Sequence, residues 1–195
     1  MKFFVESVDP SEIRTCDEQR VIDGVSIRAS SGSGDREGLI RTICGIFKGP
    51  VNAEVADDPN WAADGMLGAA RALARIAPQV VVGLPLTDEG LKVVRACAAE
   101  RIKTQVTGCV SPAQALQAAQ AGAVYVSPAA DRQGDGAGLD LVRKTIALYK
   151  TYGIAAQVLV TSVRSTSTLI DLALAGAQLA TVPFPLLRLI IEQRR

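Results

Sequence analysis

Three charged residues stand where short apolar runs end, and their types allow acid–base chemistry. They are Glu6, Arg28 and Glu54. A carboxylate can act as a general base, and a guanidinium can stabilise a developing negative charge. The same three charges can instead form an ion-pair plug that fills space, because buried charges are tolerated only when they are paired. The sequence leaves both interpretations open.

A second candidate set, Arg132, Ser162 and Arg164, is suited to holding a phosphate. Ser162 and Arg164 close the seventh apolar run of the chain, and Arg132 follows the sixth. A guanidinium can bind two phosphate oxygens at once, and a hydroxyl adds one oriented donor. The alternative interpretation is that these arginines are ordinary surface residues.

Metal and cofactor chemistry have little support in the sequence. The chain has no histidine, and its four cysteines form no C-x-x-C pair, so we expect no metal site. Cys109 is interpreted as a small buried residue rather than a nucleophile, because no histidine can activate its thiol. Neither a G-x-G-x-x-G nor a P-loop pattern occurs, and we therefore expect no cofactor.

Eight short apolar runs alternate with longer segments of helical periodicity. Runs rich in Val, Ile and Ala are typical of parallel strands that are buried on both faces. The alternation predicts an α/β fold, a compact (β/α)8 TIM barrel that forms a single domain over residues 1–195, with the candidate residues at its C-terminal face. The predicted strands are Lys2–Glu6, Val21–Arg28, Pro50–Ala56, Gln79–Leu86, Lys103–Val110, Ala123–Ala129, Ala155–Thr161 and Gln178–Pro183.

Two local patterns set the bounds of predicted helices. Trp61–Ile76 places apolar residues on one helical face. Ser111 followed by Pro112 indicates a helix N-cap and first turn, and Gly122 indicates the end of that helix.

Charge and hydropathy limit the possible partners. With 21 basic and 20 acidic residues, the net charge is +1, which favours neither nucleic acid nor an anionic membrane. No apolar run reaches the ~18 residues of a membrane helix, and the charges at Lys2 and Glu6 come too early for a signal peptide. We expect a cytoplasmic protein. The apolar residues of the short last helix, within Leu186–Arg195, predict a homo-oligomer of unknown order.

Several segments, in order along the chain, together resemble the transaldolase and fructose-6-phosphate aldolase family, in particular its short aldolase-like subfamily. This resemblance also implies a TIM barrel, and it covers nearly the whole chain. The segments are Gly24–Ser30, Val51–Val55, Thr107 with Ser111–Gln114, Ala121–Pro128, Ser162–Arg164, Leu174–Ala177 and Thr181–Pro183.

The resemblance also assigns roles to single positions. The family's fourth strand reads V-V-K-I-P, and its lysine forms a Schiff base with a sugar carbonyl; this chain has Gly83 there. Glu6 stands at the family's Asp and Arg28 at its Asn, whereas Glu54 and Thr107 match the pair that holds the catalytic water. The positions of Arg132 and Ser162 hold the substrate phosphate in the family.

We therefore predict a transaldolase-family barrel that binds a phosphorylated sugar or related metabolite without a lysine imine. Either carboxylate-based chemistry through Glu6, Glu54 and a water near Thr107, or binding without catalysis, fits this prediction. The alternative is a transaldolase or fructose-6-phosphate aldolase type of carbon–carbon transferase or lyase in carbohydrate metabolism. Whether the chain is an enzyme stays open at this point.

Overall fold

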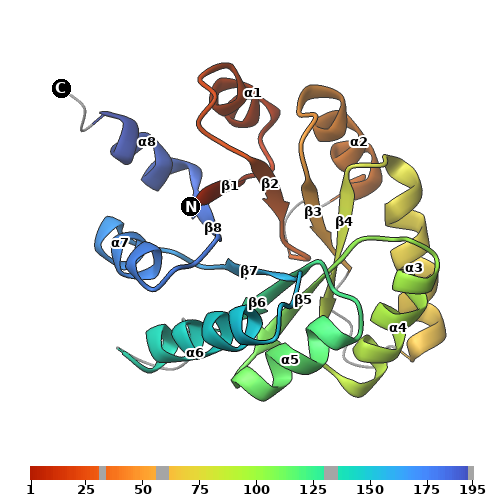
Figure 1. Cartoon of the computed structure of the whole chain (residues 1–195). Helices are drawn as coiled ribbons and strands as arrows, with labels where there is room; N and C mark the ends of the chain where they lie inside the picture. The colour runs from red at the N-terminus through yellow and green to blue at the C-terminus, as the bar shows by residue number, and fades with distance from the viewer. Residues whose placement is uncertain (31–33, 56–61, 130–135, 193–195) are drawn as a thin grey trace.

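The computed structural model of the protein describes residues 1–30, 34–55, 62–129 and 136–192. Within these ranges, eight parallel strands pair in the order of the sequence, and β8 pairs with β1 to close a barrel (Figure 1). This confirms the predicted (β/α)8 fold. The strands are β1 Lys2–Glu6, β2 Gly24–Ile27, β3 Val51–Glu54, β4 Val80–Pro85, β5 Thr104–Cys109, β6 Tyr125–Pro128, β7 Gln157–Val160 and β8 Leu179–Pro183.

A helix follows each strand, and the helices surround the barrel (Figure 1). A parallel strand pair needs such a crossover connection, because the chain must return to the starting edge. The helices are α1 Pro10–Glu18, α2 Arg36–Ile46, α3 Ala63–Ile76, α4 Asp88–Ala99, α5 Pro112–Gln120, α6 Ala137–Thr151, α7 Thr166–Leu174 and α8 Phe184–Glu192. None of the helices in the described residues is long and apolar enough to cross a membrane.

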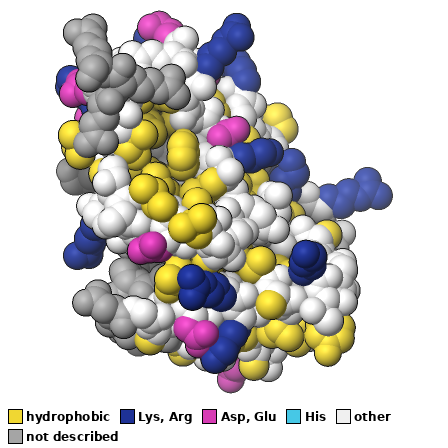
Figure 2. Space-filling view, turned by 60° about the vertical axis from the view of Figure 1, so that its left-hand side comes forward, with side chains coloured by type: hydrophobic (Ala, Val, Ile, Leu, Met, Phe, Trp, Pro, Cys, Tyr) yellow, Lys and Arg dark blue, Asp and Glu magenta, His cyan; other side chains and the backbone are white. Residues whose placement is uncertain are grey.

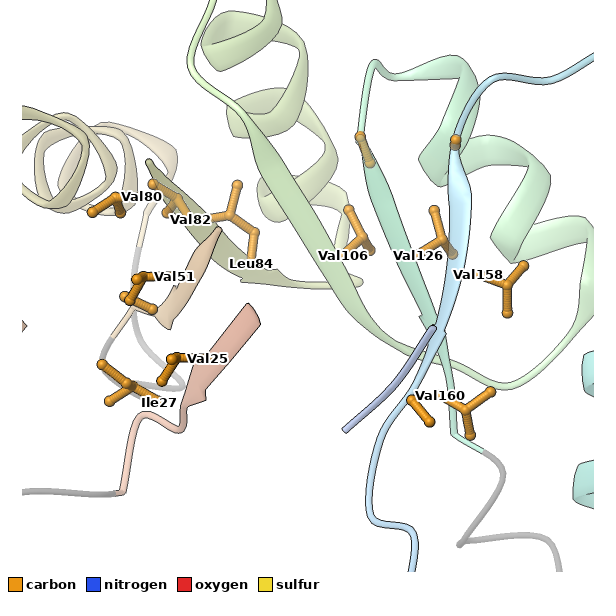
Figure 3. Packing of buried hydrophobic residues seen from close by; sticks show 14 of the residues in the cluster. Val25, Ile27, Val51, Val80, Val82, Leu84, Val106, Val126, Val158 and Val160 are labelled. Atoms are coloured by element: carbon orange, nitrogen blue, oxygen red, sulfur yellow. The ribbon is translucent and has the colours of Figure 1, made fainter. Parts of the chain in front are cut away.

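The main core lies between the strands and the helices. One set of alternating strand residues, including Val25, Val82 and Val126, points outward and is buried against the helices (Figure 3). Burial of such side chains stabilises the fold by roughly 1.5–3 kcal/mol each. Because side chains alternate along a strand, the intervening residues face the barrel axis.

The barrel interior has an apolar part and a polar part. Phe4, Leu159 and Leu179 form a separate buried cluster, in which the Phe4 ring meets Tyr125 edge-on at 5.7 Å between centroids. The polar part is a buried hydrogen-bonded row: Asn52 donates to Gln105 at 2.7 Å, and Gln105 donates to the Ser127 hydroxyl at 2.8 Å. These bonds spare the paired groups the large penalty of unpaired burial, whereas the Asn52 Oδ1 atom and the Thr181 hydroxyl have no hydrogen-bond partner among the described residues.

The predicted elements are confirmed, with shorter strands. β2 begins at Gly24 rather than Val21, because the Val21 amide still bonds to Cys16 at the end of the α1 segment. The Ser111 side chain caps α5 by accepting from the Gln114 amide, as predicted, and Gly122 follows that helix with φ +105°, a conformation that favours glycine. The predicted helix near residue 61 begins at Ala63, and Trp61 lies outside the described residues.

Candidate functional site at the barrel mouth

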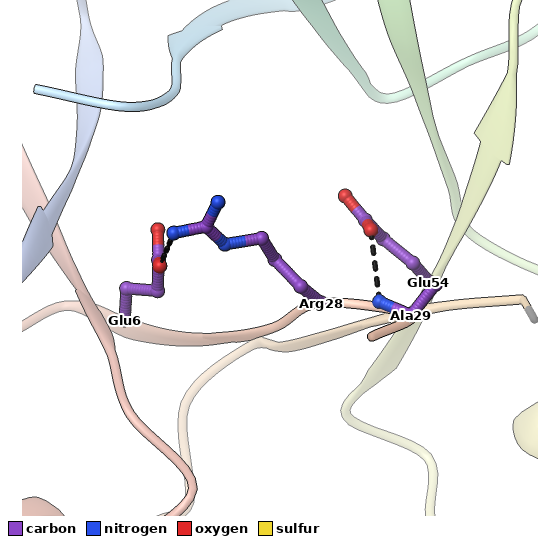
Figure 4. Close-up of polar contacts among 4 residues, drawn as sticks. All are labelled: Glu6, Arg28, Ala29 and Glu54. Atoms are coloured by element: carbon purple, nitrogen blue, oxygen red, sulfur yellow. Dashed lines mark hydrogen bonds and ion pairs between the residues drawn. The ribbon is translucent and has the colours of Figure 1, made fainter. Parts of the chain in front are cut away.

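Glu6 and Arg28 form an ion pair at the carboxyl ends of β1 and β2. The Arg28 Nη2 atom donates to the Glu6 Oε1 atom. The Arg28 side chain is 50% exposed and that of Glu6 only 16%, so the arginine lies over the carboxylate on the solvent side. Figure 4 shows Arg28 extended along the rim toward Glu6. The ion pair neutralises the carboxylate that ends the first strand.

Glu54, at the end of β3, has different partners. Its Oε2 atom accepts a hydrogen bond of 3.0 Å from the Ala29 amide (Figure 4). Its backbone carbonyl accepts from the Arg36 guanidinium. Among the described residues, Arg28 therefore contacts Glu6 and does not join Glu54 in a three-charge cluster.

Arg36 is a residue of the mouth that sequence reasoning did not single out. It begins α2, where Asp35 caps the helix, and its side chain reaches back to the ends of β2 and β3, with a 3.5 Å bond to the Arg28 carbonyl. Burial lowers the pKa of Arg36, and the nearby Glu54 charge opposes that change. Its Nε atom is buried without a partner among the described residues. This contact joins Arg36 to Arg28 and Glu54, which lie 8 and 18 residues away in the sequence.

Gly83 faces the barrel axis between the two residues of the expected water-holding pair. It is buried in β4, where it is paired in register with Glu54 of β3 and with Gln105 of β5. Thr107, two residues further along β5, donates to the Leu84 carbonyl at 3.4 Å. The side chains of Glu54 and Thr107 thus flank a strand position that has no side chain.

Every lysine of the chain lies outside this interior. All six belong to the described residues, and all six are exposed. Lys103 precedes β5 at the end of the barrel opposite the mouth, as predicted. Lys92 and Lys144 pair with Glu89 and Asp140 on the surfaces of α4 and α6. No lysine amine is therefore found beside Gly83.

Ser162 and Arg164 lie between β7 and α7 at the mouth. Ser162 adopts φ +63°, a left-handed conformation that costs a non-glycine residue roughly 1–2 kcal/mol. The other described non-glycine residues with positive φ, Arg20 and Arg101, follow helix ends. Arg164 is exposed, and Ser165 caps α7. Arg132, the third predicted phosphate ligand, lies outside the described residues.

Cys109 is a buried residue, in agreement with the interpretation from sequence. Burial raises the pKa of its thiol to about 12, which leaves almost no thiolate at neutral pH. The other cysteines are also buried and free, and burial raises the pKa of each. The described residues contain no group of three metal-ligating side chains.

Sequence comparison identifies the family. The profile described as Transaldolase/Fructose-6-phosphate aldolase matches residues 37–195. The chain belongs to this family. A "Probable transaldolase" of Geotalea daltonii is 40% identical over 190 residues, which cover 94% of this chain and 87% of that protein. A "Probable transaldolase" of Sorangium cellulosum is 42% identical over 194 residues, with 96% and 88% covered.

Solved structures support the fold alone. An N-acetylmannosamine-6-phosphate 2-epimerase from Clostridium perfringens superimposes with a TM-score of 0.69 at 12% identity, over 99% of this chain and 91% of that one. A mandelate oxidase mutant gives a TM-score of 0.64 at 17% identity, over 95% and 65%. The transaldolase family membership predicted from sequence is thus confirmed by relatives of about 40% identity, and the barrel is shared more widely.

Proposed function

We propose that this transaldolase-family protein binds a phosphorylated sugar or related metabolite at the barrel mouth and acts on it without a lysine imine. The observation that carries this proposal is the absence of an amine near the interior: Gly83 faces the axis, and all six lysines are exposed. A Schiff base requires an amine nucleophile within reach of the carbonyl. Any reaction at the carboxyl ends of the strands therefore depends on side chains other than a lysine amine.

Glu54 is the best candidate for that chemistry. Its carboxylate is held by the Ala29 amide at 3.0 Å, and Glu54 is paired in register with Gly83, which is paired in turn with Gln105. A carboxylate fixed in this way can remove a proton directly or through one water, and Thr107 on the other side of β4 can orient that water. Glu6 is already paired with Arg28, so it is the weaker base. We propose proton transfer next to a sugar carbonyl as the reaction type.

Transaldolase-type carbon–carbon transfer is the second candidate, and the names of the relatives favour it more directly than they favour the first. Relatives of 40–42% identity are called "Probable transaldolase". The two candidates differ in one intermediate. Borohydride reduction in the presence of fructose 6-phosphate, followed by mass spectrometry, traps an imine. A sugar adduct on a lysine would establish the second candidate, and an unmodified chain would support the first.

Ligand binding tests the proposed phosphate site. The natural protein is expected to show a thermal shift with phosphosugars, because a ligand at 100 times its Kd stabilises the folded state by about 2.7 kcal/mol. Ser162→Gly removes the hydroxyl and relieves the positive φ, so we expect stability within about 1 kcal/mol of the natural protein but loss of most of the shift.

Arg164→Ala is expected to weaken the same shift, since it removes the guanidinium. Arg143→Ala, an exposed arginine of α6, is the matched control and should leave the shift unchanged. A full shift in both Ser162→Gly and Arg164→Ala would contradict the phosphate site.

We also propose that the protein is a homo-oligomer. Ile170 and Leu174 lie one turn apart on α7 and are 59% and 79% exposed. Figure 2 turns the left-hand side of Figure 1, where α7 lies, toward the viewer, and it shows hydrophobic side chains exposed on this face. Exposed apolar area of this kind often marks an interface.

Replacing both Ile170 and Leu174 with aspartate is expected to lower the molecular mass measured by light scattering. As a control, replacing Arg95 and Ala99, which are exposed one turn apart on α4, with aspartate should leave this mass unchanged. A monomeric natural protein would refute the proposal.

A further inference from the structure

The glycine of β4 is in unusually close contact with its neighbour on β3. A Cβ atom added to Gly83 would lie 2.7 Å from the Cγ atom of Glu54, 2.9 Å from its Cα atom and 3.2 Å from its Cβ atom. Real Cβ atoms essentially never approach other atoms within 3.0 Å. One of the two short contacts is with a backbone atom, so a new rotamer of Glu54 cannot relieve them both. The present position of Glu54 therefore requires glycine at residue 83.

Two further contacts hold Glu54 in the same place. Its Oε2 atom accepts from the Ala29 amide, and its carbonyl accepts from the Nη2 atom of Arg36. Arg28 does not compete for the carboxylate, because it pairs with Glu6. Figure 4 shows the Glu54 carboxylate beside Ala29 and apart from the Glu6–Arg28 pair. Glu54 is thus fixed by Ala29 after the end of β2, by Arg36 of α2 and by the close approach of β4.

We propose that Gly83 is the positioning residue for the Glu54 carboxylate. The absence of a side chain on β4 lets Glu54 lie against that strand and keep its bond to Ala29. As a result, the mouth presents a hydrogen-bond acceptor beside β4, where a lysine would present an amine donor. The chemical class that fits an acceptor is a ligand hydroxyl or a proton next to a carbonyl. This choice of ligand rests on the proposed function, whereas the positioning role does not.

The positioning role is tested in the free protein through the Ala29 amide. Gly83→Ala is expected to displace Glu54 and break its bond to Ala29, so that hydrogen exchange at the Ala29 amide becomes roughly tenfold faster. The amide of Val25 donates to Pro50 at 3.0 Å in the same pair of strands, and its exchange should not change. A purely global loss of stability would accelerate both amides together.

Three variants complete the experiment. Glu54→Ala should accelerate exchange at Ala29 as Gly83→Ala does, and Glu54→Gln should not, because its amide oxygen can still accept. Gly68→Ala is the matched control, since a Cβ at this exposed position of α3 meets nothing within 4 Å. Unchanged protection of Ala29 in folded Gly83→Ala would overturn the proposal.

If Gly83→Ala is poorly folded, a double-mutant cycle of unfolding free energies at residues 83 and 54 tests the same proposal. Gly83→Ala is expected to lower the free energy of unfolding less when residue 54 is alanine, because the 2.7 Å contact with the Glu54 Cγ atom is then absent. Equal losses in both backgrounds would refute the coupling. Neither measurement contains a ligand. Failure of phosphosugar binding would therefore reject the proposed function but not the positioning role of Gly83. Failure of the exchange and stability tests would reject the positioning role but not phosphosugar binding.

Discussion

Replacing Gln105 with alanine is expected to lower the free energy of unfolding by about 3–5 kcal/mol, from the orphaned partners and the cavity together. Gln105 is 1% exposed, and it joins Asn52 to Ser127 across the barrel interior. Its removal leaves the Asn52 amide donor buried without an acceptor. The Ser127 hydroxyl loses its donor at the same time. Urea denaturation followed by circular dichroism measures the change.

The control for this substitution is Gln120→Ala. Gln120 is exposed on α5, so its loss should change stability by less than about 0.5 kcal/mol. A Gln105→Ala loss below about 1 kcal/mol would mean that water enters the interior and replaces the missing amide. The interior would then be wetter than its buried hydrogen-bonded row implies.

Restoring a lysine on β4 is expected to fail in two ways. Gly83→Lys introduces a Cβ atom 2.9 Å from the Glu54 backbone, and overpacking of this kind typically costs about 1–3 kcal/mol. The variant should also form little imine with fructose 6-phosphate, because Glu6 and Arg28 still occupy the rim as an ion pair. Urea denaturation and borohydride trapping with mass spectrometry measure the two effects.

Gly68→Lys is the control for surface reactivity, because it adds a lysine where nothing lies within 4 Å. It should fold normally and give no more adduct than the natural chain. Substantial aldolase turnover by Gly83→Lys would show that the rim tolerates the amine. The changes at Glu6 and Arg28 would then matter less than we propose.

The fold was predictable because it depends on local patterns repeated eight times. Each buried strand and each amphipathic helix carries its own periodicity, and caps such as Ser111 mark where helices begin. The inaccurate strand bounds have a local cause. The sequence pattern predicts a strand over residues 21–23. In the structure, the Val21 amide donates to the Cys16 carbonyl of α1 instead, and the Asp23 carboxylate accepts from the Phe3 amide at 2.9 Å.

The site was predictable only in part, because its contacts join distant segments. The positions of Glu6, Arg28 and Glu54 at strand ends followed from the pattern, but the sequence left open which charges pair. The role of Arg36 depends on its contact with Glu54, 18 residues further along the chain. The interior role of Gln105 depends on three strands meeting around the axis. Neither residue belongs to a local motif.

The pairing of β8 with β1 has a consequence for how the chain folds. Five residue pairs join Lys2–Glu6 to Leu179–Pro183, so β1 lacks one of its neighbours during synthesis until β8 has left the ribosome. Until then, one edge of β1 presents unpaired amide and carbonyl groups, a template for wrong pairing. Contacts so distant in sequence also slow folding. Closure of the ring is therefore expected to be the late step, and the period before closure is when the nascent chain is most exposed to aggregation.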